Sequence, residues 1–236
     1  MSLPQHLLWI AGSWQDGKGG APSQLHSPFS GEVVGTADQA SEAQIEQMLQ
    51  ASHDAHKTFS KISRHTRSKL LHGIVQGLTE RRAEIADSIV REAGKPWLLA
   101  DGEVGRALIT FTLAAEEAKR WGGEYLPVDI DPAGRAYSPA IVQWFARGPV
   151  MAIAPFNFPL NLISHKVAPA LAAGCTLMVK PPPQAPGAAK LLGEIFAKAA
   201  EAASDAQEKI PAAALQVFSC SNDLASRAVT GKPSRA

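Results

Sequence analysis

The sequence predicts an α/β protein built on a doubly wound, Rossmann-like sheet, because strand and helix patterns alternate through its second half. Three apolar runs have the length and composition of buried parallel strands. They lie at residues 150–154, 175–179 and 215–218. Helical patterns at residues 160–173 and 187–203 connect these runs, and a further helix begins at residue 222. This alternation is typical of a parallel sheet with helices on both faces.

The N-terminal part predicts an extended segment followed by helices. Residues 1–34 are rich in glycine, serine and proline and indicate short strands and turns. Gly12 to Lys18 fits the GxxxxGK pattern of a phosphate-binding loop. However, Gly19 replaces the serine or threonine that would bind Mg²⁺, and no strand-to-helix context surrounds it. We therefore assign these glycines to turns.

Three helices are expected before the sheet. Ser41 and Gln44 form a capping box at the start of the first. The apolar spacing predicts a second helix from about Arg64 to Glu92, ended by Gly94. Pro96 then starts a third helix that continues to about Trp121. On this third helix Glu103 and Arg106 are three residues apart, so we expect them to pair on its surface.

A protruding β-hairpin is expected between the helices and the sheet. Residues 125–130 and 136–145 read as strands around the turn sequence at 131–134. A two-stranded hairpin is only marginally stable alone in water. It therefore packs either against its own chain or against another subunit.

Composition excludes several classes of protein. The chain has 23 lysines and arginines against 22 aspartates and glutamates, a balance that favours neither nucleic acid nor membrane surfaces as partners. The uncharged stretch 167–179 is shorter than the ~20 residues that cross a bilayer. The apolar cluster Leu7–Ile10 is too short for a signal peptide. Two cysteines argue against a disulfide framework, so we expect a cytoplasmic protein.

Two polar residues follow the ends of neighbouring strands and predict a ligand site. Asn157 lies in a loop bounded by Pro155 and Pro159, and Lys180 ends the next strand. Parallel sheets bind ligands at the carboxyl ends of their strands. The Asn157 amide either donates to an oxygen that becomes negative during a reaction or bonds its own turn. Lys180 either binds a nucleotide or is simply solvated.

Several segments resemble the aldehyde dehydrogenase superfamily. The most specific are APFNFP at 154–159, HKVAPALAAG at 165–174 and MVKPPPQAP at 178–186. Weaker ones are GSW at 12–14, SPFSGEVVG at 27–35, TERRAEIADSIVREAGKP at 79–96, GEV at 102–104 and GGEYLPVD at 122–129. The resemblance runs through the whole chain and implies about the first half of such an enzyme. It implies a partial NAD(P)-binding domain at residues 1–122 and 147–236, and an oligomerisation arm at 123–146. The fold is then incomplete relative to the family, with the catalytic domain absent.

The resemblance assigns roles to individual residues. It implies that Asn157 forms half of an oxyanion hole and that Phe158 and Leu162 line the substrate tunnel, the alternative being ordinary core positions. It implies a cofactor site formed by the following residues: Ile153, Ala154, Pro155, Phe156, Lys180, Pro182 and Pro183. Lys166 matches a lysine near the proton path of the general base, or is a helix-surface charge. No metal ligands are implied.

The implied reaction oxidises an aldehyde to a carboxylate through a cysteine thioester, in a homo-oligomer that uses NAD or NADP. Neither Cys175 nor Cys220 matches the nucleophile. We expect Cys175 to be buried and Cys220 to be exposed at the crevice, and we expect the chain alone to be inactive. Pro183 stands where the family often has a glutamate that binds the adenosine ribose, which favours NADP. The alternative is a non-catalytic nucleotide-binding or interaction module.

Overall fold

The central sheet has five strands in the order β3-β2-β10-β9-β8. The computed structural model describes residues 3–130, 132 and 139–230. The strands are β2 (Leu8–Ile10), β3 (Ser13–Gln15), β8 (Val150–Ile153), β9 (Leu177–Lys180) and β10 (Leu215–Val217). β8, β9 and β10 are parallel, whereas β2 is antiparallel to β10 and to β3. The doubly wound α/β fold is confirmed, and two strands of the N-terminal segment extend its sheet.

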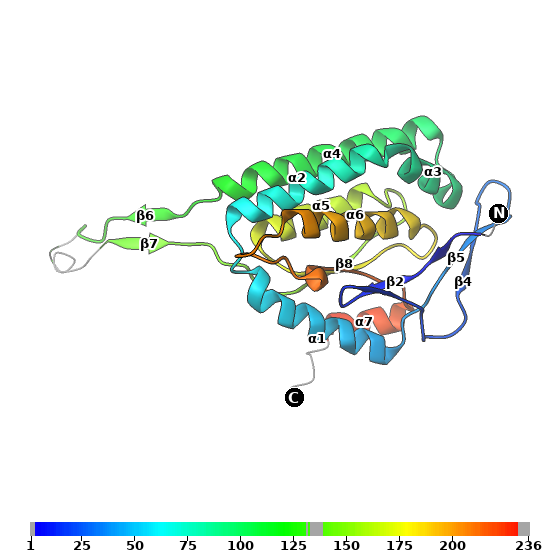
Figure 1. The fold of residues 1–236 in the computed structure, drawn as a ribbon, viewed down its shortest axis with the longest axis horizontal. Coiled ribbons are helices and arrows are strands. Elements are labelled where there is room, and N and C mark those ends of the chain that lie inside the picture. Colours follow the sequence, from blue (N-terminus) through cyan, green and yellow to red (C-terminus); the bar gives the residue numbers. More distant parts are fainter. Residues whose placement is uncertain (1–2, 131, 133–138, 231–236) are drawn as a thin grey trace.

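Helices cover both faces of this sheet (Figure 1). α5 (Asn161–Ala173) and α6 (Gly187–Ala203) pack on one face, and α1 (Glu42–Phe59) and α7 (Asn222–Thr230) on the other. Side chains alternate across a strand, so Leu177 and Val179 of β9 join the α5–α6 core while Met178 joins the α1–α7 core. Gln216 of β10 is buried, and its amide donates to the Met48 carbonyl at 2.9 Å.

An outer layer of α2 (Arg64–Glu80), α3 (Arg82–Ala93) and α4 (Trp97–Arg120) packs over α5 and α6. The prediction of one helix from Arg64 to Glu92 is wrong, because the chain turns at Arg81 (φ −103°, ψ 17°). No glycine or proline occurs at residues 78–82, and the apolar pattern continues through the break. Tertiary contacts stabilise the turn, since the Arg81 guanidinium bonds Glu84 and Glu194 of α6 at 2.7 Å.

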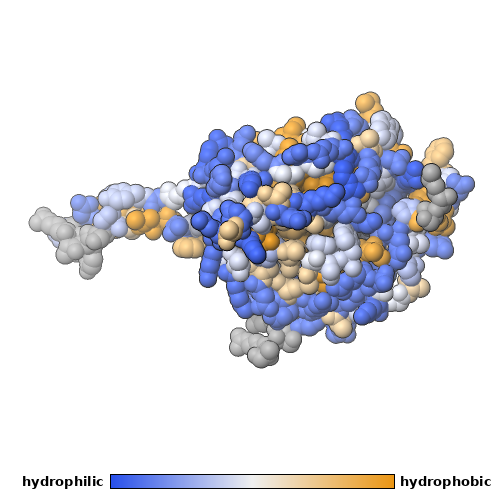
Figure 2. Space-filling view, viewed as in Figure 1, coloured by the Kyte–Doolittle hydropathy of each residue, from blue (hydrophilic) through white to orange (hydrophobic). Residues whose placement is uncertain are grey.

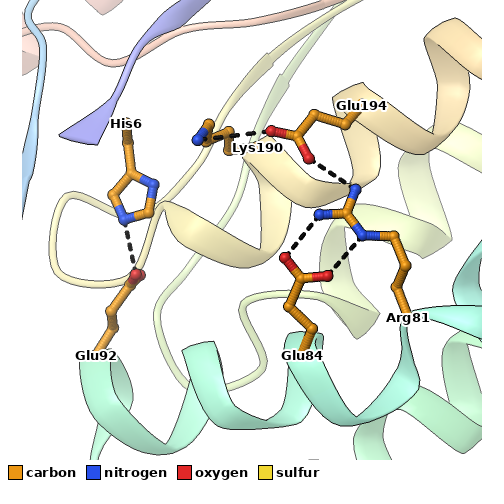
Figure 3. Close-up of polar contacts among 6 residues, drawn as sticks. All are labelled: His6, Arg81, Glu84, Glu92, Lys190 and Glu194. Atoms are coloured by element: carbon orange, nitrogen blue, oxygen red, sulfur yellow. Dashed lines mark hydrogen bonds and ion pairs between the residues drawn. The ribbon is translucent and has the colours of Figure 1, made fainter. Parts of the chain in front are cut away.

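Side-chain contacts connect segments that are distant in sequence (Figure 3). His6, in β1 (Gln5–His6), bonds the Glu92 carboxylate of α3 at 2.8 Å, and both side chains are buried. The Glu92 carboxylate also accepts the backbone N–H of Gly187, the first residue of α6, at 2.8 Å. β1 belongs to a second sheet with β4 (Ser23–His26) and β5 (Val33–Ala37). Glu92 therefore fixes this sheet against the helical layers.

The predicted helix boundaries are confirmed where capping residues specify them. Ser41 and Gln44 form the capping box of α1. Gly94 and Gly174 end α3 and α5 with φ of +64° and +85°, the left-handed conformation that glycine adopts without strain. A short 3₁₀ turn, Ala212–Ala214, precedes β10.

The predicted hairpin extends away from the body as β6 (Glu124–Leu126) and β7 (Ala140–Val142) (Figure 1). Both strands are shorter than expected. The turn predicted at residues 131–134 and the start of the second strand lie largely outside the described residues. Tyr125 and Ile141 are paired across the hairpin and are 68% and 77% exposed. Hydrophobic surface on the arm is visible in Figure 2.

Across the described residues, none of the helices is both long and apolar enough to span a bilayer.

Candidate functional site at the strand ends

The carboxyl ends of β8 and β9 lie side by side, because the two parallel strands pair in register. Ile153 is opposite Lys180, and the Ala154 N–H donates to the Lys180 carbonyl at 3.1 Å. The loop that contains Asn157 therefore starts beside the last residue of β9. Both polar residues predicted from the sequence belong to the same edge of the sheet.

The Asn157 side chain is available to a ligand. Asn157 is exposed, and its backbone carbonyl accepts the Lys95 Nζ at 2.8 Å. Its side-chain amide makes no hydrogen bond within residues 3–130, 132 and 139–230. The Asn157 amide therefore makes no hydrogen bond to its own turn within these residues.

A buried carboxylate, Glu103, holds the C-terminal end of this loop and the lysine that bonds Asn157. The Glu103 side chain has 0% exposure and accepts the Lys95 Nζ at 2.5 Å. Its other oxygen accepts the backbone N–H groups of Leu160 and Asn161 at 2.9 and 3.0 Å. The expected surface pair of Glu103 with Arg106 is wrong, because the carboxylate faces the protein interior.

The start of α5 explains why a carboxylate is needed there. Leu160 occupies the N-cap position and has no side-chain oxygen for the free N–H groups of the first turn. Glu103 supplies that acceptor from α4, and its negative charge is stabilised by the positive end of the helix dipole. The sequence signal is the missing capping residue at Leu160, which requires a partner from elsewhere in the chain.

The Phe158 ring contacts two cations. The Lys95 Nζ lies 4.0 Å from the ring centroid and the Arg106 Cζ lies 4.5 Å from it. Both distances are within the range of cation–π interactions. Phe158 is half-buried, as is Leu162 of the first turn of α5.

Two further polar residues of α5 bond within the helix. The Lys166 Nζ donates to the Leu162 carbonyl of its own helix at 3.1 Å. This contact is one that a charged side chain on the helix surface can make. His165, for which the sequence identified no partner, has its Nε2 3.2 Å from the Asn161 amide nitrogen. Neither contact reaches Asn157.

Lys180 is buried with only 3% exposure, so the alternative of a freely solvated lysine is wrong. Its Nζ lies 3.4 Å from the Oδ1 of Asn222, the first residue of α7. Sequence reasoning missed Asn222. Its position at the start of the helix that follows the third strand, at the same sheet edge as Lys180, was the available signal.

Both cysteines of the chain are buried. Cys175 is buried, as predicted, but the expected exposure of Cys220 is wrong because that residue is also buried. Burial raises the pKa of the Cys220 thiol, and the nearby Lys180 charge opposes this only in part.

The remaining predicted cofactor residues differ in exposure. Ile153 and Phe156 are 46% and 62% exposed, and Ala154 is buried. In the turn after β9 Pro182 is buried and Pro183 is exposed. The exposed members, Ile153, Phe156 and Pro183, follow the ends of β8 and β9, at the same edge of the sheet as Asn157.

A separate cavity of about 400 Å³ lies between α4 and α5 and does not include the strand-end residues. Leu113 of α4, Trp121 directly after α4 and His165 of α5 contribute to its lining. In the described part of the chain, no group of three or more histidine, cysteine or acidic side chains gathers as metal ligands would.

This fold is a doubly wound α/β fold with a polar loop at the carboxyl ends of its parallel strands. The model of the Aldehyde dehydrogenase family matches residues 14–235, and the chain belongs to that family. A putative aldehyde-dehydrogenase-like protein, y4uC, of Sinorhizobium fredii is 38% identical over 181 residues, covering 74% of this chain and 34% of the relative. Glutarate-semialdehyde dehydrogenase of Pseudomonas putida is 33% identical, covering 84% of this chain and 40% of the relative.

Solved structures of aldehyde dehydrogenases have the same fold over the length of this chain. Aldehyde dehydrogenase 21 from Physcomitrella patens, in complex with the reaction product succinate, superposes with a TM-score of 0.91 at 32% identity. That match covers 99% of this chain and 46% of the other. The chain thus spans less than half the length of each of these three proteins.

Proposed function

We propose that this chain is the cofactor-binding part of an NAD(P)-dependent aldehyde dehydrogenase that oxidises an aldehyde to a carboxylate. The observation that carries the proposal is the Asn157 amide, which is exposed and makes no hydrogen bond within the described part of the chain. It lies on a loop at the carboxyl ends of parallel strands, beside Lys180, and Lys95 and Glu103 hold that loop. Family membership supports the same kind of reaction.

Asn157 donates a hydrogen bond to the carbonyl oxygen of the substrate as that oxygen gains negative charge. A preorganised donor of this kind contributes roughly 3 to 4 kcal/mol to transition-state stabilisation. The bond from Lys95 to the Asn157 carbonyl and the bonds from Glu103 to the start of α5 fix the backbone at Asn157 and shortly after it. Phe158 and Leu162 supply apolar walls for the substrate.

The residues present fit a nicotinamide dinucleotide. When bound, the cofactor accepts a hydride from the substrate carbon. Lys180 and Asn222 offer an ammonium and an amide to ribose hydroxyls or a phosphate, while Ile153 and Phe156 offer apolar surface to a ring.

We further propose that NADP binds at least as tightly as NAD. Pro183 is exposed and carries no charge, so a 2′-phosphate near it meets no carboxylate and NAD gains no acceptor there. Each effect is on the order of 1 kcal/mol or somewhat more, which together give roughly tenfold or greater discrimination. The name of one relative, the NADP-dependent glyceraldehyde-3-phosphate dehydrogenase of Streptococcus equinus, supports this choice.

Cofactor titration tests the proposal on the chain itself. NAD and NADP are titrated by calorimetry into wild type, Lys180→Met, Pro183→Glu and a control, Lys57→Met, whose ammonium is exposed on α1. We expect the Lys180 variant to lose affinity for both cofactors and the Pro183 variant to shift preference toward NAD. Absence of binding by the wild type, or equal binding by the Lys180 and control variants, would contradict the proposal.

The second candidate function is a non-catalytic nucleotide-binding or interaction module. Its motivation is that both cysteines are buried and that burial raises the pKa of Cys220, so the chain offers no reactive thiol at the site. We expect the 236-residue chain alone not to reduce NADP with any aldehyde. Steady reduction that Cys220→Ala abolishes would overturn that expectation.

We also propose a homo-oligomer in the cytoplasm. The exposed apolar residues Tyr125 and Ile141 would be covered if the arm adds to a neighbouring copy, and two free thiols suit a reducing compartment. Light scattering on an Ile141→Lys variant checks the first point, and an unchanged mass would contradict it.

A further inference from the structure

A cavity of about 270 Å³ lies at the root of the β-hairpin arm. The arm joins the body beside the start of α2 and the end of α4, which both contribute to the cavity (Figure 1). Residues 143–146, which return from the arm, and residues 172–173, at the end of α5, complete its lining. These two segments precede β8 and β9, whereas Asn157 and Lys180 lie at the other ends of those strands. The cavity is therefore separated from the strand-end site by roughly the length of α5, ~20 Å.

Three cations line this cavity, and none of the described residues that form it is acidic. The cations are Lys61, Arg64 and Arg67, which lie at the start of α2 and just before it. None of the three side chains forms an ion pair or a hydrogen bond with the residues that the structure describes. By contrast the exposed Arg91 of α3 pairs with the Asp87 carboxylate at 2.8 Å. The positive charge of the cavity is thus not neutralised by its own lining.

Arg67 is the least exposed of these cations. Its Nε is shielded from solvent and has no hydrogen-bond partner in the described part of the chain. Its guanidinium lies against the end of α5, where a Cβ on Gly174 would come within 2.3 Å of Nη1. Burial lowers the pKa of Arg67, and the positive charge of Arg64 lowers it further. The Glu208 carboxylate opposes this only in part and bonds Thr66 instead, so an anion in the cavity would stabilise the Arg67 charge.

We propose that this cavity binds the phosphate group of a small phosphate monoester. Such a group carries a charge of about −1.5 to −2 at pH 7 and three strong acceptor oxygens, which suits three cationic donors better than the single charge of a carboxylate does. The planar guanidinium groups of Arg64 and Arg67 can each donate two parallel hydrogen bonds to phosphate oxygens. This inference is independent of the proposed function.

The size of the cavity limits the rest of the ligand. Pockets for drug-sized ligands measure ~300–1,000 Å³, and this cavity is slightly smaller. A phosphate group with a short carbon chain therefore fits better than a whole dinucleotide. Trp121 and Trp144 line the same cavity and offer apolar surface to that chain.

The alternative is that the three cations are ordinary surface charges and that Arg67 only complements the negative, carbonyl end of α5. The two roles predict different behaviour. A purely structural Arg67 contributes to stability but gives no saturable binding of an anion. A phosphate site binds saturably and depends on Arg64 as well.

The test is titration of the 236-residue chain with glycerol 3-phosphate at constant ionic strength, followed by tryptophan fluorescence. Trp121 and Trp144 report binding in the cavity, and glycerol is the uncharged comparison. We expect a saturable change with glycerol 3-phosphate and none with glycerol. Arg64→Met, which removes an exposed side chain, should weaken binding roughly tenfold, whereas the matched control Arg91→Met should leave it unchanged.

Further variants separate the outcomes. Arg67→Lys keeps the charge but loses the planar fork, so we expect it to fold and to bind more weakly than wild type. Lys180→Met should bind glycerol 3-phosphate like wild type, and loss of binding in that variant would assign the anion to the strand-end site and overturn the inference. Absence of saturable binding by the wild type, or equal affinity of Arg64→Met and Arg91→Met, would also overturn it.

A last measurement distinguishes a soluble phosphate ester from a lipid headgroup. Phosphatidic acid vesicles present the same phosphate group on a membrane surface. We expect no sedimentation of the chain with these vesicles, because the cavity is concave and small. Sedimentation that excess glycerol 3-phosphate does not reverse would contradict the proposal. NADP titration of the same variants tests the proposed function separately, since Arg64→Met should leave cofactor affinity unchanged.

Discussion

Replacing Glu103 tests whether one buried carboxylate holds the loop of Asn157. Glu103→Ala removes the acceptor of Leu160 N–H and Asn161 N–H and leaves the Lys95 ammonium, 13% exposed, without its counter-ion. Removing one partner of a buried ion pair costs ~3–5 kcal/mol. This is a large part of the ~5–15 kcal/mol by which domains are stable.

Glu103→Gln separates the hydrogen bonds from the charge. The amide oxygen can still accept from the start of α5, so we expect a smaller loss of about 1–3 kcal/mol. Adding Lys95→Met removes the uncompensated cation. The double variant should therefore be more stable than the sum of the two single changes predicts.

The assay is thermal and urea unfolding followed by circular dichroism. For a chain of this size ~3–5 kcal/mol corresponds to a fall in melting temperature of roughly 6–20 °C in Glu103→Ala. Glu117→Ala is the control, because Glu117 lies on the same helix and is 57% exposed in its pair with Arg120. Surface changes of that kind alter stability by about 0.5 kcal/mol or less. Equal losses in the two variants would refute the argument that Glu103 caps α5.

Two other predictions concern titratable groups. Hydrogen bonds from Thr66 and Ser63 lower the pKa of Glu208, so its carboxylate stabilises the fold above the unfolded pKa of ~4.3, and this contribution is lost as the pH falls through the lower folded value. Glu208→Gln should therefore be less stable than wild type at pH 7 and equally stable in strong acid, and a stability difference independent of pH would contradict this. Both cysteines are buried, and burial raises the pKa of Cys220, so neither thiol should react with a disulfide reagent until urea unfolds the chain. Rapid labelling of the folded protein would show that one of them is accessible.

Local sequence determined the helix ends and strands that neighbouring residues specify. The capping box at Ser41, the left-handed glycines at 94 and 174, and the apolar runs of β8, β9 and β10 depend on backbone preferences and short-range hydrogen bonds. The parallel order of these strands follows from the short helical crossovers between them. The approach of the Asn157 loop to Lys180 follows in turn from that order. This much of the site was predictable.

The tertiary structure decided the partners of the charged side chains. The turn at Arg81 has no local signal and is stabilised by Glu194 of α6. Spacing alone pairs Glu103 with Arg106, yet the Glu103 carboxylate faces inward and bonds the N–H groups at the start of α5 instead. Asn222 likewise meets Lys180 only through the folded sheet. Sequence determines which groups need partners, but which partner satisfies each one depends on distances that exist only once the layers have packed.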